Sequence, residues 1–212
     1  MECDPLEIDL CAEGSVAIRM LGPWPGPRFH YQQEFNSQFK KLNGRLVSIP
    51  GGRVMANKTS AALLVQYGSA QVLLGGDMEN ESWEQLEEAL TTGRGPALNP
   101  TVIKVSHHGS STASRPGMWM PDQGFYGNRP ATALAVVTPW RRGSEKRRLP
   151  DANVLKDISD SGYQTWVTGL PVGVRKGDTA LNYPEAFVHI EVSADGSATV
   201  IDSKDSSLFG AR

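Results

Sequence analysis

The pattern of hydrophobic and polar positions is clearest in the middle of the chain. Two apolar runs, at residues 60–67 and 71–74, lie on either side of Gly68 and Ser69, and this arrangement predicts a β-hairpin. Alternating or short apolar segments predict further strands at 15–21, 101–105, 132–138, 163–168, 186–192 and 197–202. The last two of these strands are expected to form a closing hairpin.

Two helices are predicted between the strands. Asn80 is expected to cap the first, which runs to about Thr91, and Asp151 the second, which ends at Gly162. Apolar residues at helical spacing give each helix a buried stripe: Trp83, Leu86 and Leu90 on the first, and Val154, Leu155 and Ile158 on the second. From residue 57 to residue 168 the order is therefore β, β, α, β, β, α, β, which indicates a layered α/β fold rather than a β-sandwich.

The composition suits a folded domain inside the cell. With 212 residues and a net charge of −2, the chain is long enough for a hydrophobic core. It lacks the charge excess of a basic nucleic-acid coat or of an acidic disordered segment. Its apolar runs are far shorter than the roughly 18–20 residues of a transmembrane helix, and its first residues lack the pattern of a signal peptide. Two cysteines do not suggest a disulfide framework. We therefore expect a cytoplasmic protein with no membrane segment in this chain.

Candidate chemistry lies where two predicted strands end. Asp77 follows Gly75 and Gly76, and a carboxylate after two glycines can approach a metal ion closely because glycine needs no side-chain room. His107 and His108 directly follow another strand, so they are expected to point to opposite sides, one into a site and one supporting it. Taken separately, the aspartate could be a turn residue and the histidines a surface pair. Together, at strand ends of an α/β sheet, they favour a functional site.

A basic stretch follows the strand predicted at 132–138. Five of the eight residues from 141 to 148 are cations: Arg141, Arg142, Lys146, Arg147 and Arg148. This stretch is either a solvated charge run or a clamp for phosphates or a nucleic-acid backbone. The two other histidines, His30 and His189, are expected to be structural, with His189 packed within its strand.

Several segments form a set when read along the chain: Asn57-x-x-Ser60, Leu74-Gly-Gly-Asp77, residues 103–111 (IKVSHHGSS), residues 135–138, Leu149-Pro150, Gly162-Tyr163 and residues 167–171. Together they resemble the metallo-β-lactamase fold, and above all the nuclease-like domain of bacterial ComEC-type competence proteins. The resemblance covers residues 15–202. It implies an αββα fold, with mixed β-sheet layers and flanking helices, of which this chain is the C-terminal half. Residues 1–14 then form an N-terminal segment, a candidate for disorder, and residues 203–212 form a tail.

The resemblance also implies a chemistry. In that family the domain holds two metal ions, which activate water to hydrolyse phosphodiesters, lactams or thioesters. Asp77 would bridge the metal ions, and one of His107 and His108 would be the late histidine ligand, with zinc the expected metal and manganese the alternative. Substrate contacts are expected from the residues around these ligands and from the basic stretch: Asn57, Ser60, Ser110, Ser111, Arg141, Arg142, Lys146, Arg147 and Arg148.

Three features of the family are missing. The HxHxDH or HxDxDH motif, which supplies most ligands of the first metal, does not occur in this sequence. Asn57 stands where many members have a further ligand histidine, and Leu149-Pro150 stands where they have His-Pro. A catalytic metal needs about three protein ligands and an open position. We therefore expect this chain alone to bind a catalytic metal poorly.

Three interpretations remain open. The chain is part of a metal-dependent hydrolase, a phosphodiesterase or nuclease, that becomes active when a protein partner or an upstream segment supplies the HxHxDH-type half. Alternatively, it is a catalytically inactive module that binds nucleic acid or a protein partner through residues 141–148. The third interpretation is a self-sufficient hydrolase with a single-metal site made from Asp77, His107, His108 and either Asp122 or His30. The uncovered sheet edge of a half-domain favours a protein partner or a homo-oligomer.

Overall fold

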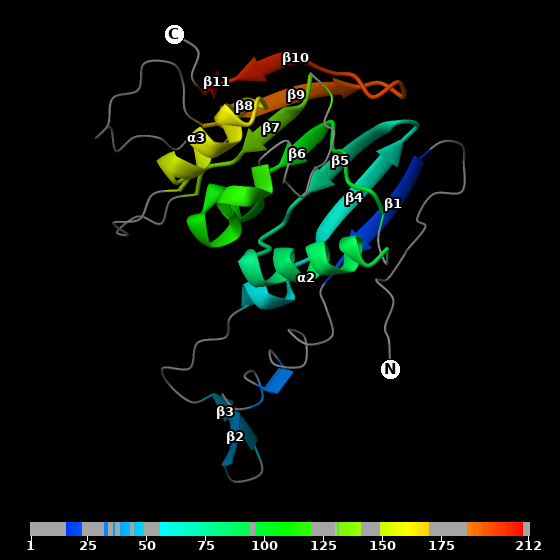
Figure 1. Ribbon diagram of the computed structural model, residues 1–212. Coiled ribbons are helices and arrows are strands. Elements are labelled where there is room, and N and C mark those ends of the chain that lie inside the picture. The colour runs from blue at the N-terminus through cyan, green and yellow to red at the C-terminus, as the bar shows by residue number, and fades with distance from the viewer. Residues whose placement is uncertain are drawn as a thin grey trace.

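The structure is a computed structural model, and it describes residues 16–22, 32–33, 36, 39–42, 45–48, 56–93, 96–119, 130, 132–140, 149–169 and 186–209. Within these residues the main element is a seven-stranded mixed sheet (Figure 1). Its strands are, in spatial order, β1 (Val16–Leu21), β4 (Ala62–Tyr67), β5 (Ala70–Leu74), β6 (Val102–Lys104), β7 (Leu134–Val137), β8 (Gln164–Thr168) and β11 (Ser206–Leu208). The strands from β5 to β8 run parallel, and β1, β4 and β11 pair antiparallel with their neighbours.

Two small hairpin sheets accompany the main sheet. They are β2 (Phe39–Leu42) with β3 (Arg45–Ser48), and β9 (Phe187–Val192) with β10 (Ala198–Lys204). The predicted α/β class with a mixed sheet is thus confirmed. Residues 203–212, expected to be a tail, contain β11, which pairs with β8 and so adds a strand to the sheet. Residues 1–14 lie outside the described part of the chain.

The two predicted helices are present as α2 (Asn80–Thr91) and α3 (Ala152–Asp160). Asp151 caps α3 as predicted, because its carboxylate accepts the backbone N–H of Asn153. The predicted cap of α2 is wrong by one residue: the N-cap is Glu79, and its side chain makes no capping hydrogen bond. No helix among the described residues is long and apolar enough to cross a membrane.

One face of the sheet is closed by both helices. Apolar side chains of alternate strand positions point to this face and pack against the stripes of α2 and α3. The members of this core include Leu64, Leu73, Ile103, Ala135 and Val167 from the sheet, Trp83 and Leu86 from α2, and Val154, Leu155 and Ile158 from α3. The predicted stripe of α3 is thus confirmed, and in α2 Trp83 and Leu86 are buried while Leu90 is only partly buried.

The other face is only partly covered. The β9–β10 hairpin packs there through Ile190, Val192, Ala198 and Val200 against Val72, Val102 and Leu134. Beyond the hairpin, on β4 and β5, Leu63, Tyr67 and Leu74 remain 38–39% exposed. Leu63 and Leu74 are paired in register, and Leu74 pairs in turn with Lys104 on β6. This part of the sheet presents an apolar surface, here called the open face, defined by Leu63, Tyr67 and Leu74.

The contrast between the two faces can be measured at neighbouring residues. Leu73 is fully buried under the helices, whereas Leu74 lies on the open face. We expect Leu73→Ala to lower the free energy of unfolding by about 2–5 kcal/mol, and Leu74→Ala by roughly 0.5–1 kcal/mol. Urea unfolding of both variants checks this. Equal losses at the two positions would show that the open face is covered in solution.

Candidate functional site

The two loops singled out in the sequence meet at one edge of the sheet. Strands β5 and β6 are parallel and pair Leu74 with Lys104, so the residues that follow them leave the sheet side by side. The loops are joined by backbone hydrogen bonds: Gly75 N–H donates to the Lys104 carbonyl at 3.0 Å, and His107 N–H donates to the Gly76 carbonyl at 2.9 Å. The loops that carry Asp77 and His107 therefore lie side by side, at the ends of two neighbouring parallel strands.

Both glycines before Asp77 are needed for this close approach. A Cβ on Gly75 would lie 2.1 Å from the Ser106 hydroxyl oxygen. Gly76 has a φ of +54°, and a Cβ there would lie 2.5 Å from the Ala61 carbonyl oxygen. From the sequence, the absence of side chains at these two glycines is expected to leave space for a metal ion beside the Asp77 carboxylate. In the structure the neighbouring backbone and Ser106 occupy it.

The two histidines lie in a left-handed turn and not in a continuing strand. The φ angles of His107, His108 and Gly109 are +44°, +56° and +73°, and residues other than glycine rarely adopt such positive φ angles. The two imidazole centroids are 6.4 Å apart, with their planes inclined at 63°. The rings contact different parts of the molecule, as the sequence predicted, although the left-handed turn, and not strand alternation, separates them.

His107 points to the start of α2 and to Asn57 on the 3-10 turn η1 (Ala56–Thr59). Its Nδ1 lies 3.3 Å from Glu79 Oε1, and its Nε2 lies 3.4 Å from Asn57 Nδ2. The Asn57 amide also donates to Glu79 Oε1 at 3.3 Å. These three side chains form a closed group, and Glu79 is a member that the sequence analysis missed.

His108 points instead to the end of β7. Its Nδ1 lies 2.8 Å from the Thr138 carbonyl oxygen, and its ring stacks on Trp140 at 6.2 Å with a 25° inclination. Because a carbonyl only accepts, His108 carries a proton on Nδ1. These contacts give His108 a structural role in joining the turn to β7.

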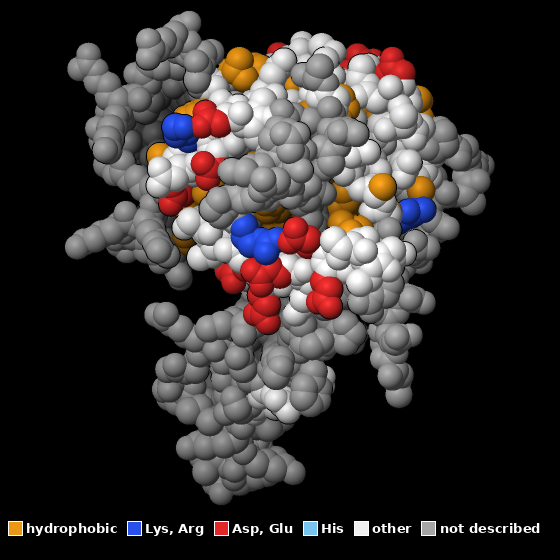
Figure 2. Space-filling view, viewed as in Figure 1, with side chains coloured by type: hydrophobic (Ala, Val, Ile, Leu, Met, Phe, Trp, Pro, Cys, Tyr) orange, Lys and Arg blue, Asp and Glu red, His pale blue; other side chains and the backbone are white. Residues whose placement is uncertain are grey.

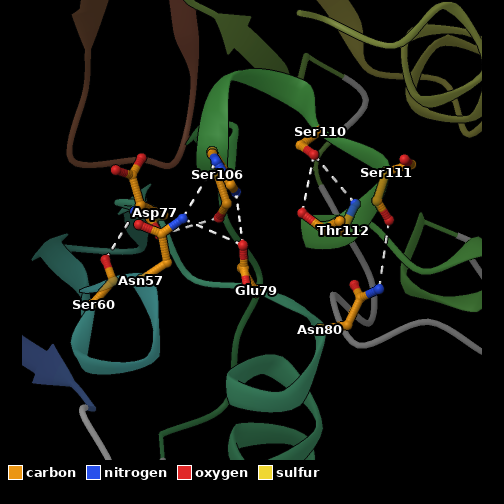
Figure 3. Close-up of polar contacts among 11 residues, drawn as sticks. Asn57, Ser60, Asp77, Glu79, Asn80, Ser106, Ser110, Ser111 and Thr112 are labelled. Carbon is orange, nitrogen blue, oxygen red and sulfur yellow. Dashed lines mark hydrogen bonds and ion pairs between the residues drawn. The ribbon is translucent and has the colours of Figure 1, made fainter. Parts of the chain in front are cut away.

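Asp77 is exposed beside this group. Its backbone N–H donates to the Ser60 hydroxyl at 2.8 Å, and in Figure 3 its carboxylate points away from the Glu79 side chain. Within the described residues, no three His, Cys, Asp or Glu side chains are placed to hold one metal ion. The donors present, Asp77 and His107 with Glu79 nearby, therefore do not by themselves fit a catalytic metal site, which needs about three ligands.

Lys104 is a second residue that the sequence analysis missed. It ends β6 on the open face, half-buried, and its ammonium donates to the Val105 carbonyl at 2.9 Å. Burial lowers the pKa of Lys104, and the negative charge of Asp77 partly opposes this shift. In the sequence, the feature that could have pointed to Lys104 is a single charged residue near the end of an otherwise largely apolar strand.

The serines after the histidines serve the local fold. Ser110 is buried, and its hydroxyl oxygen accepts the Thr112 N–H at 3.3 Å, which caps the short turn at Ser111–Ala113. Ser111 is exposed, and its carbonyl accepts from the Asn80 amide at 3.5 Å. Of the two, Ser111 is the one whose side chain is accessible to a substrate.

The cations Arg141, Arg142, Lys146, Arg147 and Arg148 lie outside the described residues, as do His30 and Asp122. The residues on either side of the basic stretch are described. Trp140 and Leu149 form an isolated antiparallel bridge. Trp140 stacks on His108, and the Asp151 N–H donates to the Gly109 carbonyl at 2.9 Å. The chain therefore enters and leaves the basic stretch beside the left-handed turn.

Acidic side chains gather over α2, where Arg115 pairs with Glu84 and Glu87 (Figure 2). This surface disfavours a polyanion, so phosphate groups would approach the sheet edge from elsewhere.

His189 lies in β9 as predicted, but the expectation that it packs there is wrong, because alternation turns its side chain outward and exposes it.

Comparisons with protein-family models, with curated proteins and with solved structures find no match for this chain.

The lowered pKa of Lys104 makes a prediction about stability. Below its folded-state pKa the buried ammonium costs free energy, and this cost declines as the pH rises toward 10.5, the ordinary value. Lys104→Met should therefore raise the free energy of unfolding at pH 7, with a gain that shrinks toward alkaline pH. Lys156→Met is the matched control, because the Asp160 carboxylate raises the pKa of that exposed lysine and no gain is expected. Urea unfolding at several pH values decides; a loss for Lys104→Met at pH 7 would contradict the argument.

Proposed function

We propose that this chain is the C-terminal half of a metallo-β-lactamase-type hydrolase domain that acts on phosphodiesters, and that a second polypeptide segment carries the HxHxDH-type half. The observation that carries the proposal is the hydrogen-bonded junction of the two loops, which places Asp77 and His107 on the same sheet edge. The resemblance of the GGD and SHHGS segments to that family supports it.

The ligand requirement explains why a second segment is needed. Asp77 and His107 would contribute one carboxylate and one imidazole to a zinc or manganese site. The other ligands have to come from the completing half, because the described residues offer no group of three. This chain would thus supply part of a site and no complete one.

The open face supports the need for a protein partner. Leu63, Tyr67 and Leu74 are large apolar side chains, each more than a third exposed, on a face that the β9–β10 hairpin already covers elsewhere. Exposed apolar patches on a sheet usually mark an interaction surface. The completing half or a second copy of the chain would bury them.

Reconstitution tests the proposal. The chain is mixed with an N-terminal half that contains an HxHxDH-type motif, and hydrolysis of DNA and of bis(p-nitrophenyl) phosphate is measured with zinc and with manganese. Asp77→Ala and His107→Ala should each lower the metal-dependent rate by more than about 100-fold. Loss of a residue that only hydrogen-bonds a metal ligand typically lowers activity by about 10–100-fold, and loss of a ligand itself should cost more. His189→Ala, at an exposed histidine remote from the sheet edge, is the matched control and should leave the rate unchanged. Undiminished activity in the Asp77 and His107 variants would refute the proposal.

A second function, binding without catalysis, is favoured by a specific observation. Both nitrogens of the His107 ring already face protein side chains, Glu79 and Asn57. A module of this kind would hold nucleic acid through residues 141–148, which the chain enters and leaves beside the left-handed turn.

Salt dependence tests this second function. If the basic stretch neutralises phosphates, replacing Arg141, Arg142, Lys146, Arg147 and Arg148 with Gln should weaken DNA binding. It should also reduce the slope of log K against log salt by about 0.9 for each phosphate that the variant no longer neutralises. Lys156→Gln with Lys204→Gln removes charge elsewhere and should change neither. Fluorescence anisotropy between about 50 and 200 mM salt covers the range over which such binding weakens. Identical slopes for the five-fold variant and the unchanged protein would exclude a clamp.

A further inference from the structure

Glu79 occupies the N-cap position of α2 but does not cap the helix. The preferred residues there are Ser, Thr, Asp and Asn, whose short side chains accept a free N–H of the first turn. Glu79 makes no such bond. Its carboxylate turns away from the helix and lies against Asn57 and His107 instead. A residue that breaks a local rule at a site is expected to serve that site.

The turn that carries His107 has a strained backbone and directs the His107 ring to Glu79. Both histidines have positive φ angles, a conformation that persists only where surrounding structure enforces it. The backbone of His107 is held by the Gly76 carbonyl. Its Nδ1 is shielded from solvent and makes no hydrogen bond, and the Glu79 Oε1 lies 3.3 Å from it. The ring is thus held with Nδ1 toward a carboxylate.

The donors and acceptors of the group fix one arrangement of protons. The Asn57 amide nitrogen carries two hydrogens, one directed to Glu79 Oε1 and one to His107 Nε2. An Nε2 that faces a donor must present its lone pair. The proton of a neutral His107 ring therefore lies on Nδ1, 3.3 Å from the Glu79 Oε1, whose negative charge favours a proton there.

We propose that Glu79 is a positioning residue: its charge, 3.3 Å from Nδ1, favours the Nδ1–H tautomer of His107 and so makes Nε2 the acceptor nitrogen of the ring. The tautomer is a property of this chain alone. Only the use made of Nε2 rests on the proposed function. Carboxylates that accept the second ring N–H of a histidine orient the ring and make its other nitrogen more basic.

The tautomer is measured by NMR of the imidazole nitrogens in the ¹⁵N-labelled chain, at a pH where the rings are neutral. His107 should show the Nδ1–H form. Glu79→Gln keeps an acceptor oxygen and should preserve it. Glu79→Leu removes the acceptor from a shielded nitrogen, and the Asn57 amide can turn its oxygen to Nε2, so the population should move toward Nε2–H. An Nε2–H form in the unchanged protein, or no response to Glu79→Leu, would overturn the proposal.

Two controls isolate the effect. Glu81→Leu removes an exposed carboxylate two residues further along α2 and should leave the tautomer of His107 unchanged. His108 donates its Nδ1–H to the Thr138 carbonyl and should keep its own tautomer in every variant. If Glu79→Leu does not fold, the near-isosteric Glu79→Gln and the unchanged protein still decide whether His107 carries its proton on Nδ1.

An activity measurement separates this proposal from the proposed function. In the reconstituted hydrolase, Glu79→Leu should lower the rate about 10–100-fold and Glu79→Gln should retain most of it. Full activity of Glu79→Leu in an active complex would overturn the positioning role while leaving the proposed function intact. If no completing half gives activity, the proposed function fails, and the NMR result alone decides whether Glu79 fixes the ring.

Discussion

The close junction between the ends of β5 and β6 is the constraint on which the rest of the site depends. Parallel pairing brings the two strand ends together, and the His107 N–H bond to the Gly76 carbonyl then ties one loop to the other. Only glycine allows this approach at residue 75, because any side chain would meet Ser106. The left-handed turn follows from the same junction, and with it the separation of His107 from His108.

In the described part of the chain, the two faces of the sheet differ because helices cover one of them and a single hairpin covers part of the other. Helices α2 and α3 bury one face, and this burial is the main apolar stabilisation of the fold. On the other face the β9–β10 hairpin covers β6 and β7 but leaves Leu63 and Leu74 exposed. The buried ammonium of Lys104 adds a local cost on that same face. Among the described residues, one face of the sheet is therefore densely packed and the other is partly exposed.

Sequence periodicity predicted six of the seven strands of the main sheet and both helices, because alternation and helical spacing directly reflect burial. It also located Asp77 and His107 at strand ends. It could not find Glu79, whose role depends on a left-handed turn that follows the neighbouring strand of the sheet. A glutamate at the start of a helix has the ordinary interpretation of a favourable charge near the helix dipole. The pairing of β11 with β8 was missed because its three residues are too short to show alternation.

The contacts that hold His107 oppose a metal ion only weakly, and the small number of ligands opposes it more strongly. A cation at Nε2 would displace one hydrogen bond from Asn57, whose net contribution is on the order of 1 kcal/mol. A complete four-ligand zinc site contributes on the order of 10–16 kcal/mol. The Asn57 contact is thus too weak to decide between catalysis and simple binding. Under the proposed function, the decision would lie with the ligands that another segment contributes, while Glu79 orients the imidazole in either case.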